Sequence, residues 1–307
     1  MKWLRKLIRK SPLLSRLADK AKTFTLPGFG KVPAYDVTVF FLNEIKRDII
    51  PIRAAAIAFS FFIAIFPAII FLITLIPHIP VKGLQDSLIG LIETFIPKNS
   101  QDLLITTITT QRGDLLSFGF ILALWFSTNG MVAVMNTFDK AHPTFRKRSW
   151  IQKRIVAGKL TLLLFLLVIF TVIMIIWGNS VTYYLAKQIH LRDTIMLPVL
   201  QIIRWSIILL LFFNSISFIY YYGPAVKEKW KFISTGSTVA TFLIILVSLV
   251  FSWYLNNFGR YNDVYGSIGT IIILLLWIYA NSYVLLIGFE INASIHYNRS
   301  LREERAS

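Results

Sequence analysis

The chain has 307 residues, of which 56% are hydrophobic and 15% charged, and its mean hydropathy is +0.65. This composition is too apolar for a soluble domain of such length, so lipid must surround much of the protein. The absence of cysteine excludes disulfides, thiolate zinc sites and cysteine nucleophiles.

Residues 1–50 are predicted to form a basic segment on the cytoplasmic side. Within the first 22 residues, apolar side chains recur at helical spacing among Lys and Arg, which favours a helix lying on an anionic inner leaflet. A solvated and partly disordered basic tail is the alternative. The segment lacks the continuous apolar core and small-residue cleavage site of a signal peptide.

Six apolar runs are long enough to cross a hydrocarbon core, which needs about 20 helical residues. They cover residues 54–76, 115–138, 160–178, 199–221, 232–254 and 268–291. We therefore expect an all-α integral membrane protein with one six-span domain over residues 51–293 and a short charged cytoplasmic tail at 294–307. Residues 84–96 add an amphipathic pattern that indicates an extracytoplasmic helix, either interfacial or re-entrant.

Basic residues are distributed unequally between the two sides of these spans. Of the 32 Lys and Arg, 25 fall on the side that carries both termini and 6 on the opposite side. The positive-inside rule then places both termini in the cytoplasm. The net charge of +17 is explained by topology, and no nucleic-acid motif accompanies it.

Glu290 is unusual because it lies near the end of the last apolar run. A helix beginning near residue 268 would place it about 33 Å deeper, close to the cytoplasmic headgroups. Arg53, at the start of the first span, is the preferred partner, and Lys159 is the substitute. Asn281, Tyr283 and Asn292 extend a polar and aromatic stripe along the same helix. The carboxylate could lock two helices together, couple substrate or proton movement, or reach the headgroups as an exposed group.

Other polar groups within the spans suggest helix contacts or lipid contacts. Asn129 and Asn136 in the second span are expected to make interhelical hydrogen bonds. Arg204, inside the fourth span, could pair with Asp263 in the outer loop 255–267, which follows the fifth span, or bind an anionic headgroup.

Proline and glycine predict local departures from regular helix packing. Pro67 removes a backbone hydrogen bond within the first span and predicts a kink there. Gly266 and Gly269 are spaced for close helix approach, or for an unwound helix start that exposes backbone groups to a ligand.

Enzyme motifs are missing from the sequence. The four histidines are scattered singly, and there is no phosphate-binding GxxxxGK[ST] loop or GxSxG nucleophile elbow. We therefore expect no catalytic residues, no bound metal, no cofactor and no enzymatic activity.

Two stretches carry a resemblance to a known family: RAAAIAFSFFIAIFP at residues 53–67, and VYGSIGTIIILLLWIYANSYVLLIGFEINA at residues 264–293. They resemble the YihY/BrkB family of bacterial inner-membrane proteins, once labelled ribonuclease BN. The most specific positions are Tyr265, Gly266, Ser267, Gly269, Trp277, Tyr279, Gly288, Glu290, Asn292 and Ala293. Pro67 and Pro224 also fall where the family has proline. The resemblance at these two positions and at Gly288 implies structural roles for all three residues.

The resemblance covers nearly the whole chain and implies a six-helix membrane protein without an agreed biochemical activity. Serum resistance and lipid or envelope-related transport have been suggested for members. The chain departs from the pattern at Phe59 and Ala64, where Tyr and Ser are common, so roles of those hydroxyls do not carry over.

Two functions are compatible with these features. The first is transport of an anionic amphipathic substrate, such as a lipid or lipid-linked envelope intermediate, with anionic membrane lipids as partners. The second is a membrane scaffold that transports nothing and assembles with envelope proteins. Assembly as a homo-oligomer stays open.

Overall fold

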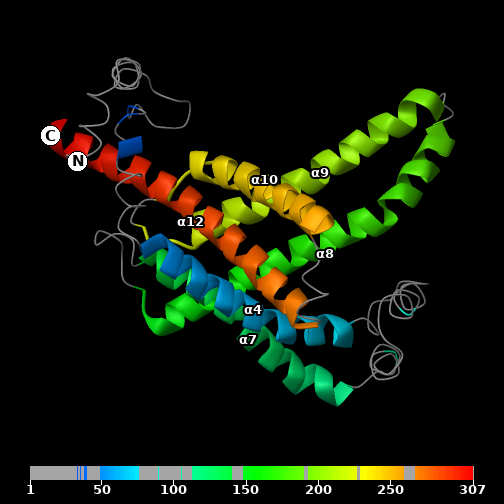
Figure 1. The fold of residues 1–307 in the computed structure, drawn as a ribbon, viewed down its shortest axis with the longest axis horizontal. Coiled ribbons are helices and arrows are strands. Elements are labelled where there is room, and N and C mark those ends of the chain that lie inside the picture. The colour runs from blue at the N-terminus through cyan, green and yellow to red at the C-terminus, as the bar shows by residue number, and fades with distance from the viewer. Residues whose placement is uncertain are drawn as a thin grey trace.

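The computed structural model describes residues 49–75, 113–139, 148–189, 193–226, 229–258 and 267–306, with six isolated positions before residue 106. The described residues contain helices and no strand. The helices are α4 (Ile49–Leu75), α7 (Gly113–Asp139), α8 (Trp150–Ile189), α9 (Asp193–Tyr222), α10 (Thr235–Phe258) and α12 (Ser267–Ala306) (Figure 1). The predicted all-α class is thus confirmed. The interfacial segments predicted at 1–50 and 84–96 lie almost wholly outside the described residues.

Each of the six predicted spans coincides largely with one of these helices. Five helices contain a stretch long and apolar enough to cross a membrane: Ile50–Pro67, Trp150–Ile175, Pro198–Tyr222, Thr235–Leu255 and Ile271–Ser300. Helix α7 contains the predicted run 115–138 but is not among these five. The sixth span therefore stays a prediction from the sequence.

Two helices are much longer than their apolar runs. Helices α8 and α12 each have 40 residues, and α12 continues to Ala306, so most of the charged stretch 294–307 belongs to this helix. An apolar run measures the thickness of hydrocarbon, whereas Lys, Arg and Glu are good helix formers and let a helix continue beyond it.

The six helices form a closed ring of neighbours. Helices consecutive among the described elements pack together, and α12 returns to pack against α4. Figure 1 shows α8 and α9 diverging together from the other four helices. We call the end where α4, α8 and α10 begin, and where α7 and α9 end, the polar end.

An aromatic cluster holds the polar end together. The rings of Phe138 in α7 and Phe289 in α12 stack with centroids 4.0 Å apart, and Tyr220 of α9 and Trp230 pack beside them. The hydroxyl of Tyr220 donates to the carbonyl of Leu285, 2.5 Å away. Buried aromatic pairs of this kind add to the free energy gained from burial, so α7, α9 and α12 are joined firmly here.

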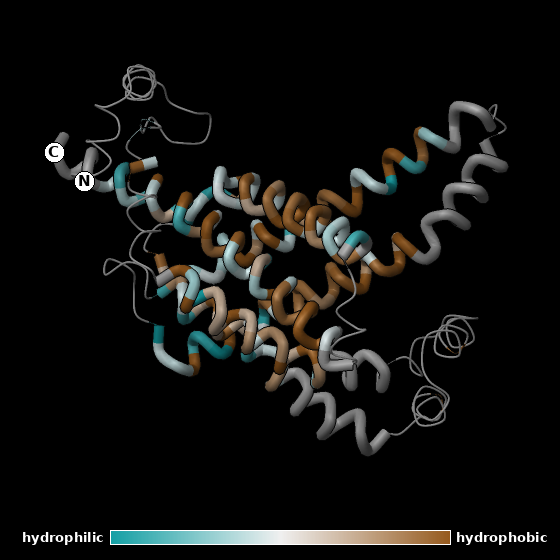
Figure 2. The backbone as a smooth tube through the Cα atoms, in the orientation of Figure 1, coloured by the Kyte–Doolittle hydropathy of each residue, from teal (hydrophilic) through white to brown (hydrophobic). Residues whose placement is uncertain are grey.

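Most of the outer surface is apolar. Only 6% of the apolar stretch of α8 is buried within the protein. Figure 2 shows hydrophobic residues along the middle of the helices and hydrophilic residues gathered where α7 ends and α8 begins. Such a surface suits contact with lipid, because exposed apolar patches this large are rare in soluble monomers.

Candidate functional site

Glu290 is buried at the polar end and faces Arg53. Glu290 Oε1 lies 3.7 Å from Arg53 Nη1, and the two side chains are 3% and 18% exposed. The ion pair expected from the depth of the two residues is therefore present, while Lys159 lies exposed on α8. The pair joins the first and last of the six helices.

Asn292, one half-turn beyond Glu290, joins α12 to the start of α10. Its Oδ1 accepts from the backbone N–H of Gly236, and its Nδ2 donates to Ser234 Oγ, both at 2.8 Å. The first N–H groups of a helix have no partner within that helix, so Asn292 supplies one from a neighbour. Gly288 lies directly against Gly236, where a Cβ on either residue would collide with the backbone of the other.

The remaining stripe residues make contacts within or between helices. Asn281 Nδ2 donates to the carbonyl of Trp277, 2.8 Å away on the same helix. Tyr283 is partly buried against the hydrophobic core. The structure thus places Glu290, Asn292 and Tyr283 in contacts between helices, while the part of each in binding or coupling stays a prediction.

The other predicted site residues are separate from this junction. The guanidinium of Arg204 lies 5.5 Å from the Trp205 ring centroid, and its predicted partner Asp263 lies outside the described residues. Gly266 is also outside them, whereas Gly269 is buried in α12. Helix α4 continues through Pro67 to Leu75, so proline does not end it.

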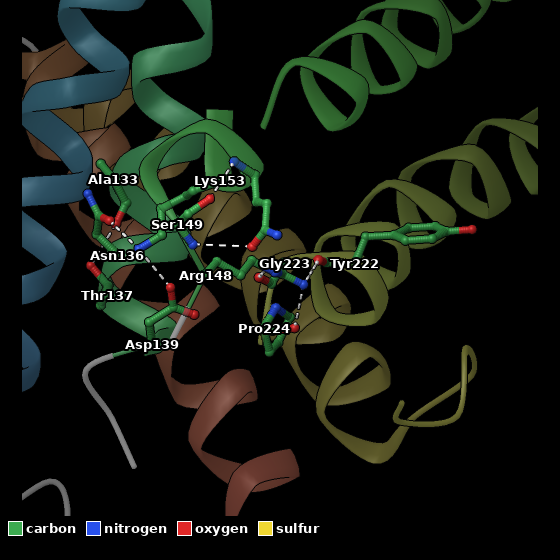
Figure 3. A network of polar contacts seen from close by, with 11 residues as sticks. Ala133, Asn136, Thr137, Asp139, Arg148, Ser149, Lys153, Tyr222, Gly223 and Pro224 are labelled. Atoms are coloured by element: carbon green, nitrogen blue, oxygen red, sulfur yellow. Dashed lines mark hydrogen bonds and ion pairs between the residues drawn. The ribbon is translucent and has the colours of Figure 1, made fainter. Parts of the chain in front are cut away.

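Pro224 takes part in a second polar cluster, which connects α9 to the start of α8. Arg148 donates to the carbonyls of Tyr222, Gly223 and Pro224 at 3.2, 2.6 and 3.0 Å (Figure 3). Carbonyl groups at a helix C-terminus carry partial negative charge and attract cations. Burial lowers the pKa of Arg148, an effect that the Asp139 carboxylate opposes.

Two cations of α8 complete this cluster by reaching α7. Lys153 Nζ lies 2.7 Å from Asp139 Oδ2 and donates to Asn136 Oδ1 at 2.8 Å (Figure 3). Arg154 Nη1 donates to Asn129 Oδ1 at 2.7 Å and to Thr128 Oγ1 at 3.1 Å. These contacts confirm the interhelical hydrogen bonds expected of the two asparagines.

The sequence did not predict the gathering of three cations. In the sequence, Arg148, Lys153 and Arg154 were used only in the count of Lys and Arg that predicts topology. A usable signal was present, because Asn129 and Asn136 are seven residues apart and therefore on one face of α7, opposite the basic start of the next helix.

In the described part of the chain, no group of three or more His, Asp or Glu side chains is gathered in a way that could hold an ion.

Residues 41–307 match the family described as "Virulence factor BrkB". The matched range contains both polar clusters and all six described helices. The chain belongs to this family. The resemblance seen in residues 53–67 and 264–293 is thereby confirmed.

Related proteins are also similar to this chain over most of its length. The ribonuclease-like protein YfkH of Bacillus subtilis strain 168 is 32% identical over 82% of this chain and 92% of its own length. A UPF0761 membrane protein of Vibrio campbellii is 23% identical over 83% of this chain and 81% of its own. A further one, from Actinobacillus pleuropneumoniae, is 21% identical over 85% and 94%. No solved structure matches the chain. The BrkB family and the apolar helices together identify a membrane protein.

Proposed function

We propose that this BrkB-family protein translocates an anionic amphipathic substrate, such as a lipid or lipid-linked envelope intermediate, across the bacterial inner membrane. The observation that carries the proposal is the buried pair of Arg53 and Glu290 between the first and last helices. Ionisable groups within membrane bundles are costly and are typically found on substrate or proton pathways.

The geometry of the pair suits exchange of partners. A hydrogen-bonded guanidinium and carboxylate lie about 2.7–2.9 Å apart, and the 3.7 Å contact here is longer. An anionic group of the substrate can therefore replace the Glu290 carboxylate beside Arg53 during transport.

Sidedness follows from charge. The polar end carries Arg53, Arg148, Lys153, Arg154 and Lys229. By the positive-inside rule, we assign this end and both termini to the cytoplasmic side.

A scaffold is the second candidate, and the closed contact between α10 and α12 favours it. Asn292 is 5% exposed, and the oxygen and nitrogen of its side-chain amide bind Gly236 and Ser234 at the start of α10, as expected of a rigid helix junction. In a scaffold, Arg53 and Glu290 would serve only to lock α4 against α12.

Translocation in proteoliposomes tests the two candidates. We expect the wild-type protein to accelerate movement of fluorescent phosphatidylglycerol between leaflets, measured by quenching of the outer leaflet. Glu290→Gln should lower the rate at least about tenfold, a change of about 1.4 kcal/mol in the barrier. Glu303→Gln, the same replacement in the last turns of α12, is the matched control.

A second variant separates function from folding. Removing one charge of a buried pair destabilises a protein by about 3–5 kcal/mol, whereas replacing both with apolar groups is often tolerated. Arg53→Met combined with Glu290→Leu should therefore fold and still fail to translocate. Wild-type protein with no effect on lipid movement, or a double variant with full activity, would favour the scaffold.

The proposal contains no catalytic step and no cofactor. The name of YfkH describes that protein, and nothing in it assigns a reaction to this chain. Hydrolysis of RNA by the purified protein, abolished by a chelator, would contradict the proposal.

A further inference from the structure

A cavity of about 430 Å³ opens at the polar end between α7 and α8. Its walls include Arg148, Lys153, Arg154, Asn129, Asn136 and Trp150. We propose that this cavity binds the phosphate group of an anionic membrane lipid. The inference does not depend on translocation, because a bound lipid is equally compatible with a scaffold.

The charge of the cavity fits an anion. Three cationic side chains line it, and none of its lining residues is acidic. Asp139 offsets one positive charge through its contact with Lys153. Arg148 and Arg154 bind only neutral oxygen atoms, and in the described part of the chain neither has a carboxylate within ion-pair distance. Two guanidinium groups therefore keep their net charge, and a planar fork of N–H donors matches the geometry of phosphate.

The asparagines add hydrogen-bond donors to the cavity. Asn129 and Asn136 each use the carbonyl oxygen of the side chain to accept from a cation of α8. Each side-chain amide also has two N–H groups that can donate to a ligand. The polar groups of the cavity are thus nearly all hydrogen-bond donors, which favours an anion over a cation or a neutral sugar.

Tryptophans place the cavity at the membrane surface. Trp150 lines it and is 67% exposed, and Trp125 lies beside Trp150 with ring centroids 6.1 Å apart. The Arg154 guanidinium stacks over Trp125 at 4.0 Å. Exposed Trp residues collect at the level of lipid headgroups, which is the depth of a lipid phosphate.

Apolar surface continues from the cavity along α8. Ile151 and Ile155, one turn apart, are 62% and 53% exposed. One turn beyond Arg154, a Cβ at Gly158 would meet no atom within 4 Å, so the helix surface there is open. A ligand bound by its phosphate could therefore lay acyl chains against α8, whereas a nucleotide or free phosphate would leave this surface uncovered.

Native mass spectrometry of the full chain in detergent tests the inference with three probes: phosphatidylglycerol, phosphatidylcholine and inorganic phosphate. We expect phosphatidylglycerol to bind about tenfold or more tightly than phosphatidylcholine, which corresponds to at least one charge-assisted contact. Inorganic phosphate should bind more weakly than the lipid, since it lacks the acyl chains. Equal binding of the two lipids would overturn the proposal, and inorganic phosphate binding as tightly as phosphatidylglycerol would replace the lipid with a free anion.

Asn136→Asp is the most informative variant. The new carboxylate keeps the size of the side chain and can still accept from Lys153, but it places a negative charge in the cavity. Binding of phosphatidylglycerol should fall about tenfold or more because like charges at this distance repel. Lys159→Gln, which removes an exposed charge from the same helix outside the cavity, should keep wild-type binding.

Folding is monitored by the thermal midpoint in detergent for each variant. Should Asn136→Asp fail to fold, Lys153→Gln takes its place and is expected to weaken binding in the same direction. Unchanged binding in a folded variant of either kind would overturn the proposal. Wild-type protein that binds phosphatidylglycerol at the cavity but moves no lipid would keep this site while removing the translocation function.

Discussion

The contact between α10 and α12 and the junction between α7 and α8 use similar residues for opposite results. At the first, Gly236 and Gly288 bring two backbones together, and Asn292 fills the remaining space. At the second, long side chains hold the helices apart around a cavity, with Asn129 and Asn136 in its wall.

Asparagine shows the difference most clearly. The oxygen and the nitrogen of the Asn292 side-chain amide are both bound at the start of α10, so the residue closes an interface. The asparagines of α7 are bound through oxygen by cations, and their donors remain for a ligand. A polar residue within a membrane bundle therefore acts as a helix contact or a binding group according to how many of its hydrogen-bonding groups the protein itself satisfies.

Gly288→Ala is expected to give the largest effect on the closed contact. The added Cβ would lie 2.7 Å from Gly236 O and from Ala240 Cβ, and it would also meet the Tyr220 hydroxyl. Overpacking against a backbone costs about 2–3 kcal/mol even after the better helix propensity of alanine is included. The free energy of unfolding in detergent, measured by denaturant titration, checks the value.

Gly158→Ala is the matched control for the open junction. The same methyl group would meet nothing within 4 Å in α8. We expect this variant to be neutral or stabilised by up to about 1 kcal/mol, because alanine is the better helix former. Equal losses at the two glycines would remove the distinction between the closed and the open contact.

Arg148→Gln should have a smaller effect. The replacement removes a guanidinium that binds three carbonyls at the end of α9, and glutamine can restore at most part of this set. A loss of about 1.5 kcal/mol in unfolding free energy is expected for partly exposed hydrogen bonds of this type. The thermal midpoint should fall accordingly.

Lys229→Gln provides the comparison on the same side of the bundle. Lys229 lies 4.8 and 5.0 Å from the ring centroids of Tyr221 and Tyr222 and is exposed. Exposed cation–π contacts contribute about 0.5 kcal/mol, so this loss should be about a third of that at Arg148. A larger effect at Lys229 would show that charge alone, and not the capping of α9, stabilises this end.

The sequence was sufficient for the helices and for one contact of the site. Apolar runs located six helices because each must bury its backbone hydrogen bonds within hydrocarbon. Equal depth identified Arg53 as the partner of Glu290, since charged residues near a helix end meet partners at the same level. Helix ends were predicted poorly, as α8 and α12 show, because polar helix formers leave no hydropathy signal.

The cavity between α7 and α8 could not be predicted from the sequence, for a different reason. Its walls come from the C-terminal half of α7 and the start of α8, and Arg148 is held in place by the carbonyls of Tyr222, Gly223 and Pro224 at and just after the end of α9. Periodicity along one helix cannot show which faces of three helices converge. The count of Lys and Arg predicted a positive charge for this end of the molecule, but it did not predict where the cationic side chains gather.

Helix capping gives the finest comparison between the two regions. Ser234 precedes α10, and its Oγ accepts from the Ser237 N–H at 3.1 Å and from Asn292 Nδ2 at 2.8 Å. Ser149 precedes α8, and its Oγ accepts only from the exposed Gln152 N–H at 3.3 Å. Both serines form reciprocal capping contacts, but only the serine at the closed contact also binds another helix.

Ser234→Ala should therefore cost about 1 kcal/mol and Ser149→Ala about 0.5 kcal/mol of unfolding free energy. Combining Ser234→Ala with Asn292→Ala should cost less than the sum of the two single losses, because the two side chains share a hydrogen bond. Additive losses would mean that this shared bond contributes nothing to the contact between α10 and α12.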